Sequence, residues 1–313
     1  MRKRYRVVAV GDICVDIKTD PLSDFTLGDR QFRVKDLSLS VGGNSANFCL
    51  GAANLGLDTS INCCLGRDAI SSWLRERMTK AGVKVVVKRP GKGTAAITYG
   101  LTHTDGTRQM ITFNGPNLQF GERDIDYSLV KSADHLHRSG FWWTPKLWGE
   151  PTRRLMRFAQ DNNIETSLDV GTDPEGWHQE RREYVYQTLE HTDTFFGNET
   201  EITMLAQKRG LKKAADALLG MGAMIVVAHL GSKGSALFTK REAVKAPAFK
   251  IEPRNPIGSG DIFNAGFTFA RSMEWDVKRC LTFANACAAY YIERLEAPYP
   301  STRDLKRRFK FGR

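Results

Sequence analysis

The chain has 313 residues, of which 41% are apolar and 26% charged, and its formal net charge is +11 at pH 7. This length allows one large α/β domain or two smaller ones with a substantial core. No stretch approaches the run of about 20 apolar residues that a membrane span requires. The N-terminal MRKRYRVVAVGD lacks the apolar stretch and cleavage site of a signal peptide. We therefore expect a cytosolic protein without a membrane partner.

The positive charge raises the question of a nucleic-acid partner, because phosphate contacts dominate such binding. Lys and Arg are nevertheless spread along the chain, and they are dense only in residues 1–6 and 303–313. No motif of a nucleic-acid-binding module accompanies them. A basic surface that attracts small anionic molecules explains the charge equally well, so we predict no nucleic-acid partner.

Short apolar runs that end in glycine or a polar residue predict buried parallel strands. The first is YRVVAVG at residues 5–11, and others lie at 59–66, 134–140, 164–171, 193–198 and 223–231. Helical patterns separate most of them, at residues 45–56, 68–82, 151–163 and 201–210. This alternation predicts an α/β fold, a doubly wound parallel sheet with helices on both faces.

Two stretches depart from the alternation of strands and helices. Residues 31–41 alternate polar and apolar side chains, and residues 94–113 have the pattern of a hairpin that turns at Asp105–Gly106. They predict a small β-sheet, built from about residues 13–40 and 94–113, inserted in a single domain that spans residues 1–313. A lid over a ligand site is the functional interpretation. An edge extension with no role in the site is the alternative.

The stretch NPIGSGD at residues 255–261 places an aspartate directly behind a Gly-Ser-Gly sequence. Glycines allow successive amides to be exposed, and a helix that begins there offers a site for an anion. A carboxylate would repel that anion unless it acts on a neighbour, such as a hydroxyl about to attack a phosphate. The alternative is that Asp261 only complements the positive end of the helix dipole.

Other polar residues and glycines follow the predicted strands, where ligands bind in open α/β sheets. Asp12 and Asp16 come after the first strand, and Gly42, Gly43 and Asn47 introduce the first helix. Aspartate and asparagine together suit the hydroxyl groups of a sugar-like ligand. The alternatives are a turn-forming role for Asp12 and an ordinary loop for the two glycines.

Two more strand ends carry candidate residues. Asn198 and Glu201 lie three apart at a helix start, where they can orient a hydrated Mg²⁺ or form a capping box. HLGSKG at residues 229–234 contains Gly231 and Gly234, which let the backbone approach a bound nucleotide or make a hairpin turn.

Together these residues resemble the ribokinase-like (PfkB) family of carbohydrate kinases. The resemblance rests on GDICVD, GGNSAN, NETE, LGSKG, NPIGSGD and FANACAAYYIERLEAPYP, in this order over nearly the whole chain. It implies a doubly wound α/β/α domain with a small β-sheet lid. It also implies transfer of the γ-phosphate of ATP to a hydroxyl of a sugar or nucleoside.

The resemblance implies a role for each group of candidate residues. Asp261 would be the general base. The other implied sets are an anion hole of Gly258, Ser259 and Gly260, an acceptor site of Asp16, Gly42, Gly43 and Asn47 with Asp12 adjacent, a Mg²⁺ site organised by Asn198 and Glu201, and a nucleotide site bounded by Asn198, Gly231, Gly234 and the stretch around Asn285.

The sequence departs from the family pattern D-T-x-G-A-G-D at its first residues, Asn255 and Pro256. In relatives the first aspartate lies near a monovalent-cation site, so activation by potassium is in doubt. Cys14 stands where some sugar kinases carry a substrate-binding asparagine. SGFWWT after the third strand places Phe141, Trp142 and Trp143 either in the acceptor pocket or in the core.

The expected function is that of an ATP- and Mg²⁺-dependent kinase for a sugar or sugar derivative. A nucleoside kinase of the same family is an alternative, and so is a phosphate-ligand binding protein with impaired catalysis. The alternating patterns of the predicted lid leave apolar faces and strand edges that one small sheet does not cover. We therefore also expect a homodimer joined through the lid.

Overall fold

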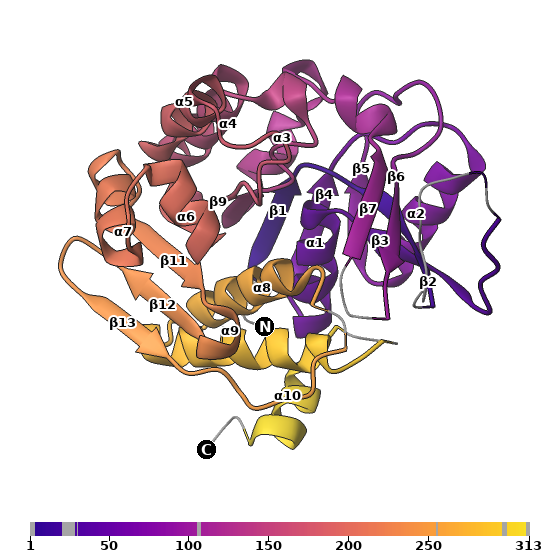
Figure 1. Ribbon diagram of the computed structural model, residues 1–313. Helices are drawn as coiled ribbons and strands as arrows, with labels where there is room; N and C mark the ends of the chain where they lie inside the picture. Colours follow the sequence, from indigo (N-terminus) through magenta and orange to yellow (C-terminus); the bar gives the residue numbers. More distant parts are fainter. Residues whose placement is uncertain are drawn as a thin grey trace.

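The computed structural model describes residues 4–20, 29, 31–104, 108–254, 256–295 and 299–310. Nine strands of these residues form the central sheet: β1 (Arg6–Val10), β4 (Asp58–Asn62), β5 (Val83–Val86), β8 (His135–Arg138), β9 (Glu165–Asp169), β10 (Thr194–Asn198), β11 (Ile225–His229), β12 (Ser235–Phe238) and β13 (Ala243–Ala246). Their order is β13-β12-β11-β10-β9-β8-β1-β4-β5 (Figure 1). Strands β11 to β5 in this order run parallel, and β12 and β13 are antiparallel.

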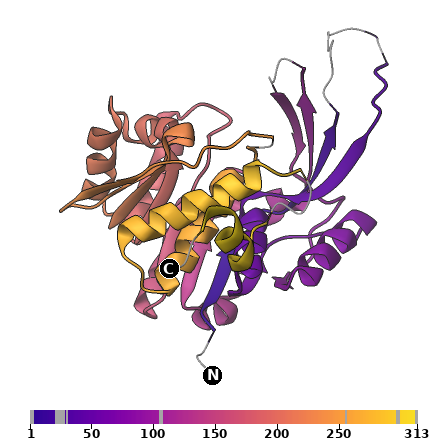
Figure 2. The same cartoon turned by 90° about the horizontal axis from the view of Figure 1, so that it is seen from below.

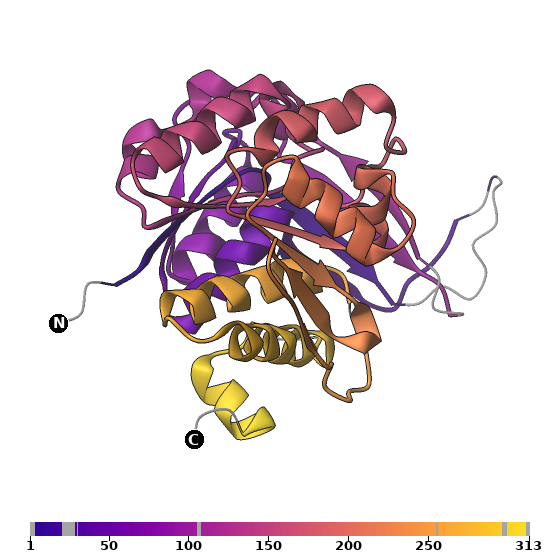
Figure 3. The same cartoon turned by 90° about the vertical axis from the view of Figure 1, so that its left-hand side faces the viewer.

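The helices of the described residues are α1 (Asn44–Leu55), α2 (Ala69–Lys80), α3 (Tyr127–Lys131), α4 (Glu150–Asp161), α5 (Gln179–Leu189), α6 (Glu199–Ala206), α7 (Leu211–Gly220), α8 (Ser259–Ser272), α9 (Val277–Ile292) and α10 (Thr302–Phe309). Figure 3 shows α4 to α7 on one face of the sheet and α1, α8 and α9 on the other. This arrangement confirms the predicted α/β fold. Within the described residues, no helix is long and apolar enough to cross a membrane.

The central strands are buried on both faces because helices cover both, and β4, β8 and β9 bury polar side chains, such as Asn62, His137 and Ser167, together with apolar ones. Phe195 of β10 packs in the core beneath α4 to α7, and its neighbour Phe196 packs beneath α8 and α9. Successive strand residues point to opposite faces of a sheet, so a strand covered on both faces buries nearly every residue, which favours continuous apolar runs such as RVVAV in β1. This is the pattern from which the strands were predicted.

The three strands that the prediction missed are short, and they lie at the two ends of the strand order, β5 at one end and β12 and β13 at the other. β5, β12 and β13 have four residues each, which is too few for a clear periodicity. Only the short turn Gly231–Lys233 separates β11 from β12. A parallel connection requires a crossover of about a dozen residues, so this turn forces the antiparallel pairing.

A second sheet contains β2 (Cys14–Thr19), β3 (Leu37–Gly42), β6 (Ile97–Thr102) and β7 (Arg108–Phe113). Its order is β3-β2-β6-β7, and it projects from one end of the molecule (Figure 2). The predicted hairpin is present as β6 and β7, while its turn at Asp105–Gly106 lies outside the described residues. The strand expected over residues 31–41 begins only at Leu37, and β2 pairs with β6 in parallel.

The small sheet has one polar and one apolar face. Pairing aligns Asp16 with Ser40 and Thr98, and Thr98 with Thr112, so the even-numbered residues share a face. The odd-numbered residues form the other face, which we call the outer face; its exposed members are Leu37, Leu39, Tyr99, Ile111 and Phe113, each between 46% and 60% exposed. The polar face points toward the end of the central sheet, where the candidate site lies.

Candidate active site

The N-terminus of α8 is built on Gly258. This residue has φ of 81°, and a side chain there would lie 3.0 Å from both Asn47 Nδ2 and Tyr291 Oη. A positive φ and close neighbours both require glycine. The Ser259 hydroxyl donates to the Pro256 carbonyl at 2.8 Å, which stabilises the turn before the helix. Gly260 and Asp261 thus lie in the first helical turn, whose amides have no acceptor within the helix.

Asp261 is almost completely buried at this N-terminus and is 3% exposed. Asn44 Nδ2 donates to its Oδ1 at 3.1 Å, and Asn47 Nδ2 donates to its Oδ2 at 3.3 Å. Burial raises the pKa of Asp261 well above its usual value, and the negative charge of Asp169 raises it further, although the two amides oppose the shift. A carboxylate of this kind is held in position and is more basic than an exposed aspartate.

Two cavities meet at residues 256–261. The first has a volume of about 480 Å³, and because Asp12, Asp16 and Asp261 line it we call it the carboxylate cavity. The second, of about 520 Å³, has mainly apolar walls, and we call it the apolar cavity. Gly258 and Asp261 face the carboxylate cavity, whereas Ser259 and Gly260 face the apolar cavity. The first turn of α8 therefore borders both.

The carboxylate cavity contains most of the residues predicted for the acceptor: Asp12, Asp16, Gly43 and Asn47. Asp12 accepts hydrogen bonds from the backbone amides of Asn44 at 3.2 Å and Ser45 at 3.0 Å, so it caps α1 from another segment. Gly42 does not line the cavity, but a side chain there would overlap the Asp16 carboxylate. Trp143 lines the cavity, while Phe141 and Trp142 are buried in the core.

The apolar cavity contains three of the residues predicted for the nucleotide: Gly231, Gly234 and Asn285. The Asn285 side chain donates to the carbonyls of Ala246 at 3.2 Å and Pro247 at 3.1 Å, which holds the segment after β13 against α9. Asn198 was also predicted for the nucleotide, and it lines neither cavity.

Asn198 and Glu201 form a capping box at the start of α6. The Glu201 amide donates to Asn198 Oδ1 and the Asn198 amide donates to Glu201 Oε2, both at 2.8 Å. Thr172 Oγ1 donates to the other Glu201 oxygen at 2.7 Å. The structure thus contains the capping box that was the alternative to a Mg²⁺ site. Lone pairs that remain on Glu201 suit water of a hydrated ion better than direct coordination.

A buried polar chain beneath the α8 N-terminus was not predicted. Asn264 donates to Asp169 Oδ2 at 2.6 Å, and its oxygen lies 2.9 Å from Nε2 of His229, which lines the apolar cavity. Burial raises the pKa of Asp169, and the nearby Glu201 raises it further. The sequence analysis also assigned no role to Asn44, although this residue belongs to the motif GGNSAN. A signal existed for Asp169, because it ends a predicted strand.

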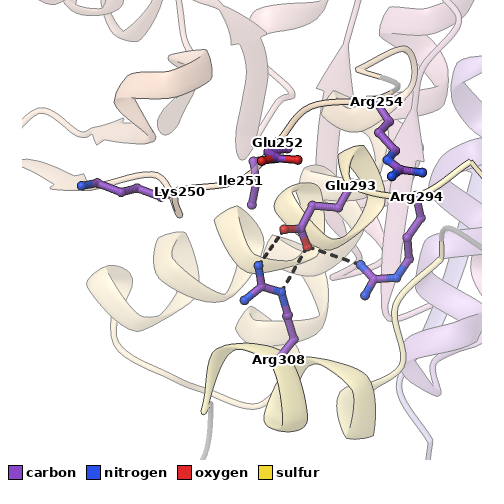
Figure 4. A pocket seen from close by; sticks show the side chains of 7 residues that line it. All are labelled: Lys250, Ile251, Glu252, Arg254, Glu293, Arg294 and Arg308. Atoms are coloured by element: carbon purple, nitrogen blue, oxygen red, sulfur yellow. Dashed lines mark hydrogen bonds and ion pairs between the residues drawn. The ribbon is translucent and has the colours of Figure 1, made fainter.

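An open pocket of about 670 Å³ lies on the outer side of residues 250–254, beside α9 and α10 (Figure 4). Arg308 donates to Glu293 at 2.7 Å, and Arg294 lies 3.5 Å from the same carboxylate. Lys250 and Ile251 line both this pocket and the apolar cavity. Phe309 of α10 packs against Phe249, with ring centroids 4.5 Å apart, so this helix supports the segment that forms a wall of the apolar cavity.

Comparison with known proteins agrees with this geometry. The sequence profile of the pfkB family carbohydrate kinases matches residues 5–303. An ATP-dependent ribose-1-phosphate kinase of Halopiger xanaduensis is 27% identical over 96% of both chains. A nucleoside kinase of Methanothermobacter thermautotrophicus is also 27% identical, over 97% of this chain and 95% of the other.

Among solved structures, the fold is similar to that of a putative ribokinase II from E. coli in complex with ATP and Mg²⁺. Its TM-score is 0.84 at 21% identity, over 98% of this chain and 99% of that one. The profile match covers nearly the whole chain, and the curated relatives are kinases of small molecules. The chain therefore belongs to the pfkB family of carbohydrate kinases, and it is a phosphotransferase whose acceptor is a hydroxyl group of a sugar or sugar derivative.

Proposed function

We propose that the protein transfers the γ-phosphate of ATP to an acceptor in the carboxylate cavity. The observation that carries this proposal is the position of residues 256–261. This continuous segment lines both the carboxylate cavity and the apolar cavity. A phosphoryl group passes directly between donor and acceptor oxygens, so catalysis requires the two sites to meet at one point. The first turn of α8 is such a point.

In this proposal Asp261 is the general base. Its carboxylate faces the acceptor side, and two amide donors from α1 hold it in place. It would accept the proton of the attacking hydroxyl, for which its raised pKa is an advantage. The amides of Gly258 and Gly260 would surround the transferring group, and the positive end of α8 would stabilise its charge. The predicted third amide, that of Ser259, already donates to the Pro256 carbonyl at 3.2 Å.

The apolar cavity is the proposed nucleotide site. Its volume, glycines and apolar walls suit a nucleoside, and Gly260 brings the phosphate end toward α8. Glu201, with Asn198, would hold Mg²⁺ through water, because each of its oxygens already accepts one hydrogen bond. The ion, when bound, neutralises negative charge on the phosphates.

A coupled assay of ADP release tests this function. The purified protein should release ADP from ATP and Mg²⁺ only when an acceptor from a panel of sugars, sugar derivatives and nucleosides is present. A nucleoside as the best acceptor would favour the alternative kinase. Nucleotide binding without any ADP release would instead favour a binding protein with impaired catalysis.

We also propose a homodimer joined through the small sheets. The outer face leaves five large apolar side chains exposed, Leu37, Leu39, Tyr99, Ile111 and Phe113. An apolar sheet face of this kind is usually covered by a partner. A second copy placed there would bury the outer face and leave the polar face over the cavity. Light scattering should therefore give twice the 35.1 kDa mass of one chain.

A further inference from the structure

Tyr299 follows α9 in the chain and makes two hydrogen bonds to α1. Its hydroxyl donates to Asn47 Oδ1 at 3.1 Å, and its carbonyl accepts from Asn54 Nδ2 at 2.7 Å. Asn47 and Asn54 lie about two helical turns apart on α1, so Tyr299 lies along this helix. It belongs to the motif FANACAAYYIERLEAPYP, in which the sequence analysis assigned a role only to the stretch around Asn285.

The Tyr299 hydroxyl is the outer end of a hydrogen-bond chain that leads to Asp261. Asn47 accepts from Tyr299 through Oδ1 and donates through Nδ2 to Asp261 Oδ2 at 3.3 Å. Asn47 is 6% exposed, so its oxygen and its nitrogen both find their partners within the protein. Burial raises the pKa of Tyr299 well above its usual value, and nearby acidic groups raise it further. The phenol therefore stays protonated and remains a donor.

The orientation of the Asn47 amide affects the protonation of Asp261. An ionised carboxylate only accepts hydrogen bonds, whereas a protonated one carries an O–H group that needs an acceptor. Asn47 presents its N–H group to Asp261, which favours the ionised form and opposes the effect of burial on the pKa. A protonated Asp261 would reach the Asn47 oxygen only after rotation of the amide, and Tyr299 occupies that oxygen. Tyr299 thus stabilises the form of Asp261 that can accept a proton.

We infer that Tyr299 is a positioning residue for phosphoryl transfer, whose hydroxyl fixes the Asn47 amide and, through it, the carboxylate of Asp261. The inference rests on the proposed function, in which Asp261 is the general base. Tyr299 itself lines neither cavity. If Tyr299 only attached the segment after α9 to α1, the hydrogen bond of its carbonyl to Asn54 would be sufficient.

Tyr299→Phe removes the hydroxyl and keeps both the ring and the carbonyl. With the best acceptor in the ADP-release assay, kcat should fall by about threefold to tenfold, because one hydrogen bond of a buried group is lost. Nucleotide affinity, measured by calorimetry, should stay at its wild-type value. The acid limb of kcat/KM should move to higher pH by about half a pH unit, because Asn47 can then accept from protonated Asp261 and the pKa of Asp261 rises. Asn44 still donates to the other Asp261 oxygen, which limits the shift.

The other titratable groups near Asp261 are the same in wild type and in this variant. Within the described residues they lie on β2, β9, β11 and α9 and after β1, and they are Asp12, Cys14, Asp16, Asp169, His229 and Tyr291. Phenylalanine is as uncharged as a protonated tyrosine. A shift of the acid limb therefore reports the hydrogen bonding of Asp261 and not a change of charge around it.

Asn54→Ala is the matched control, because Asn54 is exposed and makes the other hydrogen bond to Tyr299. This variant should lower Tm slightly and leave kcat and the acid limb unchanged. The opposite result would overturn the inference: Tyr299→Phe with a lowered Tm but with the kcat and acid limb of wild type. Tyr299 would then serve only to attach the segment to α1.

A direct measurement of the pKa of Asp261 separates this inference from the proposed function. The carboxyl signal can be titrated by NMR in protein with labelled aspartate and assigned with Asp261→Asn. The pKa should be higher in Tyr299→Phe than in wild type, whether or not any acceptor supports ADP release. In the Asn47→Leu background the same substitution should have no further effect, because the chain is already broken. An equal pKa in wild type and Tyr299→Phe, or an equal shift in both backgrounds, would show that the inference is wrong. Absence of ADP release with every acceptor would contradict only the kinase proposal.

Discussion

The N-terminus of α8 and the small sheet border the same cavity, yet they are stabilised in different ways. Asp261 is buried and held by two amides of α1, and Gly258 has neighbours that exclude any side chain. The small sheet packs at its base against the main body and exposes apolar residues such as Ile111 and Phe113 at its outer face. The N-terminus of α8 is thus held by neighbouring residues, whereas nothing within one chain covers the exposed residues on the outer face of the small sheet. We expect phosphoryl transfer to depend on the N-terminus of α8, and acceptor binding and dimer formation to depend on the small sheet.

The largest expected effect is that of Asp261→Asn. Turnover should fall on the order of 10²-fold or more, because proton transfer is lost while the amides of α8 remain. Nucleotide affinity, measured by calorimetry, should be retained. Asp276→Asn is the matched control, since Asp276 caps α9 and lines neither cavity, and asparagine also caps a helix. Near-normal turnover in Asp261→Asn would refute its role as base.

A smaller effect is expected at the outer face. Ile111→Lys should convert the proposed dimer to a monomer and raise KM for the acceptor by about tenfold or less, because the unsupported sheet closes the cavity less well. Light scattering and the ADP-release assay measure the two effects. Met224→Lys is the control, because Met224 is 62% exposed but lies outside the small sheet. A wild-type monomer at high concentration would contradict the dimer.

The pH dependence of activity tests the buried network below α8. Burial and the charge of Asp169 raise the pKa of Asp261, and a general base acts only when deprotonated. Activity should therefore be lost as pH falls through this raised pKa. Asp169→Asn removes one negative charge and lowers the pKa of Asp261, so the acid limb of kcat/KM should move to lower pH.

The pKa of Asp169 is itself raised to about 7, so wild type loses this charge as the pH falls below neutral. The expected gain of Asp169→Asn relative to wild type is therefore about twofold to fivefold near neutral pH after normalisation at the optimum, and it shrinks at more acidic pH. Asp161→Asn is the control, because Asp161 is an exposed residue at the end of α4. An acid limb that stays in place would show that Asp169 does not influence the base.

Monovalent cations should have the smallest effect. Asn255 lies outside the described residues, but its neutral amide attracts a weakly held cation less than a carboxylate does. Pro256 restricts the conformation of the preceding residue, which favours partial order without an ion. Replacing potassium by a bulky organic cation at constant ionic strength should change activity by less than about threefold. Strong activation of wild type, with little further gain in Asn255→Asp, would contradict this prediction.

Much of the fold follows from local patterns. The apolar run at residues 193–198 predicts β10 because both faces of the strand are covered, as Phe195 and Phe196 show. The strands β12 and β13 could not be predicted in this way, since they are short and the pairing of β12 with β11 depends on the turn at Gly231–Lys233. The parallel pairing of β2 with β6 also has no local sequence signal, because the two strands are far apart in the chain.

By itself the sequence determined the kinds of residue available at each strand end, because the apolar runs that predict the strands are followed by glycine, aspartate or asparagine. It placed Asp261 behind a glycine-rich turn and Asp16 after the first predicted strand, near the start of the predicted lid. Only the tertiary structure decided which of them meet. Asn44 and Asp261 are 217 residues apart and form a hydrogen bond because α1 packs against α8. Contacts over such separations depend on the packing of whole helices, and no local pattern encodes that packing.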